Sequence, residues 1–156
     1  MSQSEKNWSL SAILLATAGG SLVLAGLYFL LLRPPLLPED IRFMALSDVQ
    51  LAAIRSRLEA WLSPVFRVMG GYILATGALA ITLAATAFRL HLRGAGIGAL
   101  VAGAASIGVM AVVNFVIESD FKWILLGIAV LWASSLLIYW REARRARGLA
   151  AAKGGI

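Results

Sequence analysis

Apolar residues of this chain are gathered into four long blocks that are separated by shorter polar segments. The blocks cover residues 9–32, 65–88, 94–117 and 121–140. A helix over the first block is roughly 36 Å long at about 1.5 Å per residue, which is enough to cross a hydrocarbon core of about 30 Å with some tilt. The pattern predicts an all-α fold, a four-helix transmembrane bundle that forms a single integral membrane domain over residues 1–156.

The polar segment between the first two blocks predicts a helix of its own. Prolines at 34 and 35 end the first span, because neither can donate a backbone hydrogen bond. Ser47 then resembles an N-cap, and Gln50 completes a capping box. Apolar residues follow at helical spacing: Leu51, Ile54, Leu58, Trp61 and Leu62. We therefore expect an amphipathic helix over about 48–62, ended by Pro64. It is too polar to span, so it lies in the membrane interface or caps the bundle.

Two rows of small residues recur at intervals of four, the spacing that lets helix backbones approach each other closely in a membrane. The rows are Ala12, Ala16 and Gly20 in the first block, and Gly94, Gly98 and Ala102 in the third. Each row fits either packing inside the bundle or self-association with a second copy. Because the third block is small-rich at one end, we expect its helix in the centre of the bundle.

Charge predicts how the chain is oriented. Hydrophobic residues make up 60% of the chain and charged residues 14%, against about 25% charged in soluble domains. The net charge of +6 comes from basic residues that flank the apolar blocks, which favours contact with membrane lipids over nucleic acid. Eight basic residues, compactly placed, fall on the side of the termini and six on the other side. The positive-inside rule predicts N-in/C-in topology, with the 33–67 loop periplasmic or extracellular.

The same topology places a basic tail, residues 141–156, in the cytoplasm, and we expect it to be disordered beyond Gly148.

Several kinds of chemistry are excluded by residues that the chain lacks. It has no cysteine and one histidine, His91, so it offers no thiol chemistry, no polyhistidine metal centre and no haem ligand pair. No ionisable side chain lies in the middle of an apolar block, which argues against a stand-alone ion-coupled transporter. We expect no cofactor and no metal site.

Polar groups converge at the predicted non-cytoplasmic end. Six of the eight acidic residues fall there: Glu39, Asp40, Asp48, Glu59, Glu118 and Asp120. One hypothesis is a pocket in the outer leaflet, roofed by the amphipathic helix, with Glu118 paired to Arg67 and Asn114 beneath them. The candidate binding residues are Arg67, Asn114, Glu118, Asp120, Trp61 and Tyr72.

Each of these residues also has a purely structural interpretation. Acidic residues such as Glu118 and Asp120 commonly cap the start of a helix, where the helix dipole favours negative charge. Arg67, at the end of a span, can extend to lipid headgroups. Asn114 can form an interhelical hydrogen bond.

The segment from Arg67 to Gly77, with the sequence RVMGGYILATG, carries a resemblance to a known family. It resembles the start of the second helix in small bacterial DoxX-like and related four-helix membrane proteins. The resemblance implies a four-helix bundle in a bacterial inner membrane, with suspected association of some members with redox or quinone-linked complexes. It supplies no catalytic residues to carry over, and the lack of cysteine excludes a thiol-redox role for this chain.

The leading expectation is a small non-enzymatic inner-membrane protein. It would be an accessory or partner-binding subunit that holds a lipid-like or quinone-like molecule at the outer leaflet, with a membrane protein or a second copy as partner. The alternative is an outer-interface enzyme or carrier for an apolar substrate, using Glu118, Asp120 and Arg67.

Overall fold

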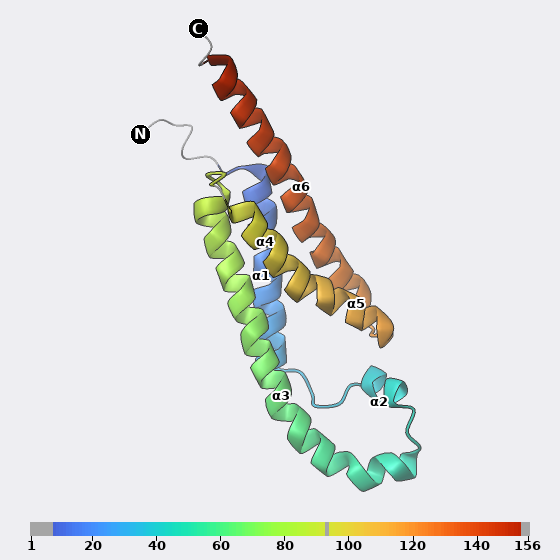
Figure 1. Ribbon diagram of the computed structural model, residues 1–156. Helices are drawn as coiled ribbons and strands as arrows, with labels where there is room; N and C mark the ends of the chain where they lie inside the picture. The colour runs from blue at the N-terminus through green and yellow to red at the C-terminus, as the bar shows by residue number, and fades with distance from the viewer. Residues whose placement is uncertain (1–7, 93, 154–156) are drawn as a thin grey trace.

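The computed structural model describes residues 8–92 and 94–153, and all regular secondary structure in these residues is helical. The elements are α1 (Leu10–Leu31), α2 (Pro38–Met44), α3 (Asp48–Leu83) with π-helical η2 (Ala84–Phe88), α4 (Ala95–Gly103), π-helical η3 (Ala104–Gly108), α5 (Val109–Val116) and α6 (Lys122–Lys153). Figure 1 shows the long elements running side by side, with α2 set apart at one end.

Four helices within the described residues are long and apolar enough to cross a membrane. They are Leu10–Leu31, Asp48–Phe88, Ala95–Val116 and Lys122–Gly148. The prediction of an all-α chain with four candidate spans is confirmed in these terms, and the fold is consistent with a multi-pass membrane protein. The start of α1, the α3–α4 turn and the end of α6 lie at one end, and α2 lies at the other (Figure 1).

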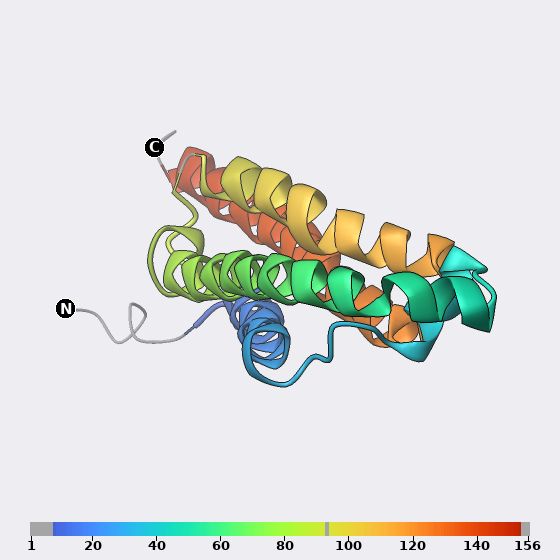
Figure 2. The same ribbon diagram turned by 90° about the horizontal axis from the view of Figure 1, so that it is seen from below.

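α1 makes the most extensive helix contacts, because it packs against both α3 and α6. The helix formed by α4, η3 and α5 packs chiefly against α6 and meets α3 only near the turn that joins them. The expected central position for the third span is therefore wrong. Its valines at 101, 112 and 116 are exposed, and Figure 2 shows it along one edge of the bundle.

Glycines bring the backbones of α1 and α3 into contact. A Cβ added to Gly26 would lie 2.8 Å from the carbonyl oxygen of Gly70, and one added to Gly19 would lie 2.8 Å from that of Gly77. Gly19 and Gly26 are seven residues apart in α1, and Gly70 and Gly77 are seven residues apart in α3. The two glycines of each helix therefore lie on one face of it. No side chain fits between these backbones, which is why the two helices form the closest pair in the bundle.

The predicted small-residue rows divide between the interior and the surface. Ala12 is buried and Ala16 packs against the core, whereas a Cβ on Gly20 would meet nothing within 4 Å. Gly94 lies in the turn before α4 with φ of 88°, and Gly98 and Ala102 are exposed.

The neighbouring row of α4 makes the internal contact instead. Ala95 and Ala99 are buried, and the carbonyl oxygen of Ala99 accepts a hydrogen bond of 2.9 Å from Nε1 of Trp132 in α6. Packing of the third span inside the bundle thus uses the face beside Gly98 and Ala102, which leaves those two residues at the surface.

The expected helix break at Pro64 is wrong. α3 runs through Pro64 without interruption, so the amphipathic segment forms roughly the first third of a 41-residue helix, Asp48–Phe88. The missing proline N–H leaves the carbonyl of Ala60 without its usual partner, and Ala60 is exposed, so water can solvate that carbonyl. Figure 1 shows α3 bending along its first half.

The start of this long helix is formed as the sequence predicts. The hydroxyl of Ser47 accepts from the backbone N–H of Gln50 at 3.3 Å, and Oε1 of Gln50 accepts from the backbone N–H of Ser47 at 3.0 Å. This reciprocal pair is a capping box.

α6 continues from the fourth apolar block into the basic tail, with the bounds Lys122–Lys153. The remaining tail residues, 154–156, lie outside the described residues.

Candidate functional site

Two clefts open at the end of the bundle where α2 lies. The first, here called the α6-side cleft, measures about 420 Å³ and lies among α1, α2, α5 and α6. The second, the α3-side cleft, measures about 530 Å³ and lies among α1, α3, η3 and α5. They share one wall, formed by Phe29, Arg33, Asp40, Met110, Asn114 and Ile117. Both volumes fall in the range of small-molecule sites, about 300–1,000 Å³.

Arg33 is the residue around which the two clefts meet. Only 6% of its side chain is exposed. Its guanidinium donates from Nη2 to Oδ2 of Asp40 at 3.0 Å and from Nη1 to the carbonyl oxygen of Pro34 at 3.0 Å. The guanidinium carbon lies 3.4 Å from the ring centroid of Phe66 and 5.3 Å from that of Phe29. The cation is thus held between two rings and one carboxylate.

The sequence around α2 explains why Asp40 reaches Arg33. Pro38 is the first residue of α2, a position where its missing N–H has no cost. Oδ2 of Asp40 accepts a hydrogen bond of 2.9 Å from the backbone N–H of Leu37, so it stabilises the helix start. The same oxygen accepts from Arg33, so one carboxylate both caps α2 and ties it to the end of α1.

Glu39 is the most buried ionisable group at this end. The residue is 3% exposed, and its Oε1 accepts a hydrogen bond of 3.3 Å from the hydroxyl of Ser119, which is itself 2% exposed. This bond joins α2 to the turn between α5 and α6. A second link at the surface is the ion pair between Arg42 and Asp120, at 3.1 Å.

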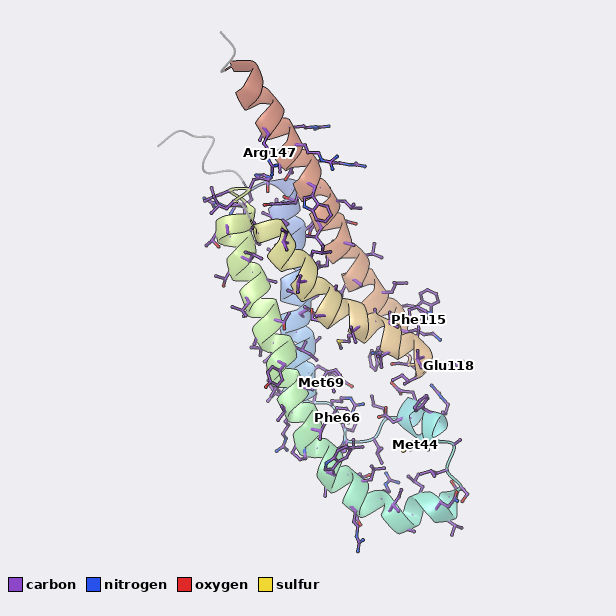
Figure 3. All side chains as sticks on the ribbon, viewed as in Figure 1. Met44, Phe66, Met69, Phe115, Glu118 and Arg147 are labelled. Carbon is purple, nitrogen blue, oxygen red and sulfur yellow. The ribbon has the colours of Figure 1, made fainter. Side chains whose placement is uncertain are left out.

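Two of the predicted binding residues line these clefts. Asn114 belongs to the shared wall, and its Nδ2 donates to the carbonyl oxygen of Met110 in its own helix at 2.8 Å, so this amide makes no interhelical bond. Tyr72 lines the α3-side cleft and is largely exposed. Figure 3 shows Phe66 and Met69 on the same stretch of α3.

The other predicted binding residues lie outside both walls. Trp61 and Arg67 are exposed on α3, and Asp120 is engaged with Arg42 at the surface. Within residues 8–92 and 94–153 no ion pair joins Glu118 to Arg67. Glu118 instead ends α5 in a left-handed conformation, with φ of 52° (Figure 3).

The roof of the site also differs from the expectation. Residues 48–62 line neither cleft, and the segment Arg33–Leu37 together with α2 closes this end instead. The cause lies in Pro38, Glu39 and Asp40. A proline at the first helical position followed by two acids is a helix-start signal, and the sequence suggested a turn or a cap there.

Sequence reasoning missed the aromatic part of the site. Phe29 precedes Arg33 by one helical turn, a spacing that places the ring and the guanidinium on one face. Phe66 approaches Arg33 from another helix, and no local pattern indicates that contact.

A separate polar cluster closes the opposite end of the bundle. Oε2 of Glu142 in α6 accepts a hydrogen bond of 2.5 Å from the buried hydroxyl of Ser11 and lies 3.2 Å from Nε2 of His91. The His91 ring stacks on Tyr139, with centroids 5.1 Å apart. The cluster joins α1, the α3–α4 turn and α6. No group of three or more possible metal-ligating side chains occurs in the part of the chain that the structure describes.

The fold and the clefts define a helical bundle with four candidate membrane spans and a largely apolar site at one end. Comparison of the chain with protein-family models, with curated proteins and with solved structures finds no match.

Proposed function

We propose that this chain is a small non-enzymatic multi-pass protein of a bacterial inner membrane that holds a lipid-like molecule in the clefts beside Arg33. The observation that carries the proposal is the shared wall, where Arg33, Asp40 and Asn114 border two clefts whose other lining residues are mostly apolar. A molecule with a long apolar body and one polar head is matched by such a surface.

Helix lengths support a position for these clefts near one membrane surface. The helix Asp48–Phe88 has 41 residues and is roughly 60 Å long at about 1.5 Å per residue, twice the thickness of a hydrocarbon core. If Phe88 lies at one surface, Arg67 lies roughly 32 Å away, at the other. Arg33 and Glu118 follow spans of 22 residues each and reach the same depth. The clefts then lie within the outer leaflet.

The first half of α3 is proposed to be interfacial. Val49 is 81% exposed and Trp61 is 63% exposed, while Arg55 pairs with Glu59 on the helix surface at 2.8 Å. Exposed apolar and basic side chains on one helix favour the boundary between lipid and water. In the proposed orientation this half lies outside the cytoplasm, and the arginines at the end of α6 lie inside it.

A binding role is favoured over an outer-interface enzyme or carrier by the placement of three charged residues. Glu118 and Arg67 form no pair within the described residues, and Asp120 is bonded to Arg42. Catalysis by side chains needs them within hydrogen-bond reach of one reacting group. The exposed apolar faces of α4 and α5 suit a membrane-protein partner or a second copy, so the protein would serve as an accessory subunit.

Native mass spectrometry of the purified protein tests the proposal. We expect a bound lipid-like adduct on the wild type, and we expect Ile117→Trp to remove it because Ile117 belongs to the wall shared by both clefts. Val116→Trp is the matched control, since Val116 is 65% exposed and lines neither cleft. A wild type that is free of any adduct but bound to another membrane protein would contradict the proposal.

A further inference from the structure

We propose that the α6-side cleft selects a lipophilic cation, an amine or quaternary ammonium on a long apolar chain, through the carboxylate of Glu39. This inference rests on the proposed binding function of that cleft and specifies the charge of the ligand head. Its basis is the balance of charges in the wall, the hydrogen bonding of Glu39 and the rings that surround it.

One ionisable side chain of the α6-side cleft has no charged partner within the described residues. The wall contains three ionisable side chains, Arg33, Glu39 and Asp40. Arg33 and Asp40 form an ion pair of 3.0 Å with each other. Glu39 is left without a charged partner in a largely apolar wall.

The protein does little to compensate this charge. Within the described residues, the Ser119 hydroxyl is the one hydrogen-bond donor to the Glu39 carboxylate, and it is neutral. A carboxylate that is 97% removed from solvent normally has a cationic or multiple hydrogen-bond partner, because burial of an uncompensated charge is costly. A cationic ligand head would supply that partner.

Among the residues that the structure describes, Arg33 is the one cationic side chain that lines the cleft. Arg42 is occupied by Asp120 at the surface, and Nζ of Lys122 lies over the Phe115 ring, 6.0 Å from its centroid. Neither side chain belongs to the cleft wall.

Aromatic rings add a second feature that suits a cation. Tyr28, Phe29 and Phe121 line the same cleft, with the Tyr28 ring 5.9 Å from Phe29 and 6.0 Å from Phe121. The faces of such rings attract organic ammonium groups. The apolar side chains Leu24, Ile124 and Ile128 continue the wall away from Glu39 and can hold the chain of the ligand.

Other head groups suit this wall less well. An anionic head would meet the carboxyl group of Glu39 and find no unpaired cation in the wall, because Arg33 is already paired with Asp40. A quinone head presents only carbonyl acceptors, so it supplies neither a cation nor a hydrogen-bond donor to the Glu39 carboxylate. The cleft therefore favours a cation over the quinone-like molecule that the sequence left open.

The test uses the full chain in nanodiscs of zwitterionic lipid and three radiolabelled probes that share a twelve-carbon chain. These are dodecyltrimethylammonium, dodecanol and dodecyl sulfate. We expect the wild type to bind the ammonium probe most tightly. Glu39→Gln should weaken that binding at least about 10-fold, the scale of one charge-assisted contact, while dodecanol binding changes less than about twofold. Glu118→Gln removes an exposed acid at the same end and should change neither affinity.

If Glu39→Gln does not fold, Tyr28→Leu serves in its place, because it removes a ring and keeps an apolar side chain of similar size. It should weaken binding of the ammonium probe and leave dodecanol binding unchanged. Equal affinity of the wild type for the ammonium and dodecanol probes, with both blocked by Ile117→Trp, would overturn this inference and leave the proposed function standing. Failure of all three probes to bind the wild type would overturn both.

Discussion

The guanidinium carbon of Arg33 lies 3.4 Å from the centroid of the Phe66 ring. This contact fastens the end of α1 to α3 two residues beyond Pro64, at the point where the long helix leaves the bundle. The Asp40 carboxylate holds the same guanidinium from the side of α2. The three helices that close this end therefore meet at one side chain.

Substitution of Arg33 tests this junction. Arg33→Ala leaves Asp40 without its cation, and loss of one partner of a buried pair costs about 3–5 kcal/mol. We expect the free energy of unfolding to fall by about 3 kcal/mol, the lower end of that range, because Asp40 still accepts a hydrogen bond from the backbone N–H of Leu37. Arg33→Lys keeps the charge but loses the planar stacking on Phe66, and should cost about 1 kcal/mol. Unfolding in detergent measures both, and an alanine variant as stable as the wild type would refute the junction.

Adjacent glycines in α3 give a sharp test of the α1–α3 contact. A Cβ on Gly70 would lie 2.9 Å from the backbone nitrogen of Leu30, so Gly70→Ala should destabilise the protein by about 2 kcal/mol. A Cβ on Gly71 would meet nothing within 4 Å, so Gly71→Ala should be neutral or gain up to about 1 kcal/mol of helix propensity. Thermal unfolding of the two variants compares them directly. Equal stabilities would show that the register of these helices is wrong.

Glu118 provides a test of a structural role at the end of α5. Its φ of 52° is unfavourable for a residue with a side chain, by about 1–2 kcal/mol. Glu118→Gly should therefore stabilise the protein by about 1 kcal/mol and leave ligand binding unchanged. Glu118→Ala is the control, because it removes the carboxylate but retains the Cβ. Loss of binding in the glycine variant would restore Glu118 to the site.

Orientation can be measured with single cysteines because the natural chain has none. Asp48→Cys places a thiol at the exposed start of α3. Arg147→Cys places one at an exposed position in the last part of α6 (Figure 3). A membrane-impermeant maleimide should label Asp48→Cys in intact cells and Arg147→Cys only after permeabilisation. The reverse pattern would overturn the proposed topology.

Periodicity and capping were enough to predict the four long helices, because apolar blocks and the Ser47–Gln50 box are local signals, whereas the short helix α2 was not predicted. The continuity of α3 through Pro64 was not predictable in this way. It depends on whether the carbonyl of Ala60 can be solvated, and exposure is set by the tertiary fold. Gly70 and Gly71 illustrate the same limit, since only the register with α1 decides which of the two is packed.

The candidate site was predictable as a region and not residue by residue. Span lengths place Glu39, Asn114 and Glu118 at one depth, and the structure keeps them at one end. Whether each of these side chains points into the bundle or out of it depends on the conformation of one or two residues in a turn. α2 buries Glu39 against Ser119, whereas the left-handed turn at Glu118 leaves that side chain exposed.

The most direct test of the account is photolabelling with a lipid that carries a diazirine in its acyl chain, followed by peptide mapping along α5. Asn114 and Ile117 line both clefts, whereas Val112 and Val116 of the same helix are 64% and 65% exposed and line neither. If a lipid is bound in the clefts, labelling at 114 and 117 should be saturable, and unlabelled lipid should compete it away. Labelling at 112 and 116 should be weak and non-saturable. Equal, non-saturable labelling of both faces would show that the clefts hold no specific ligand.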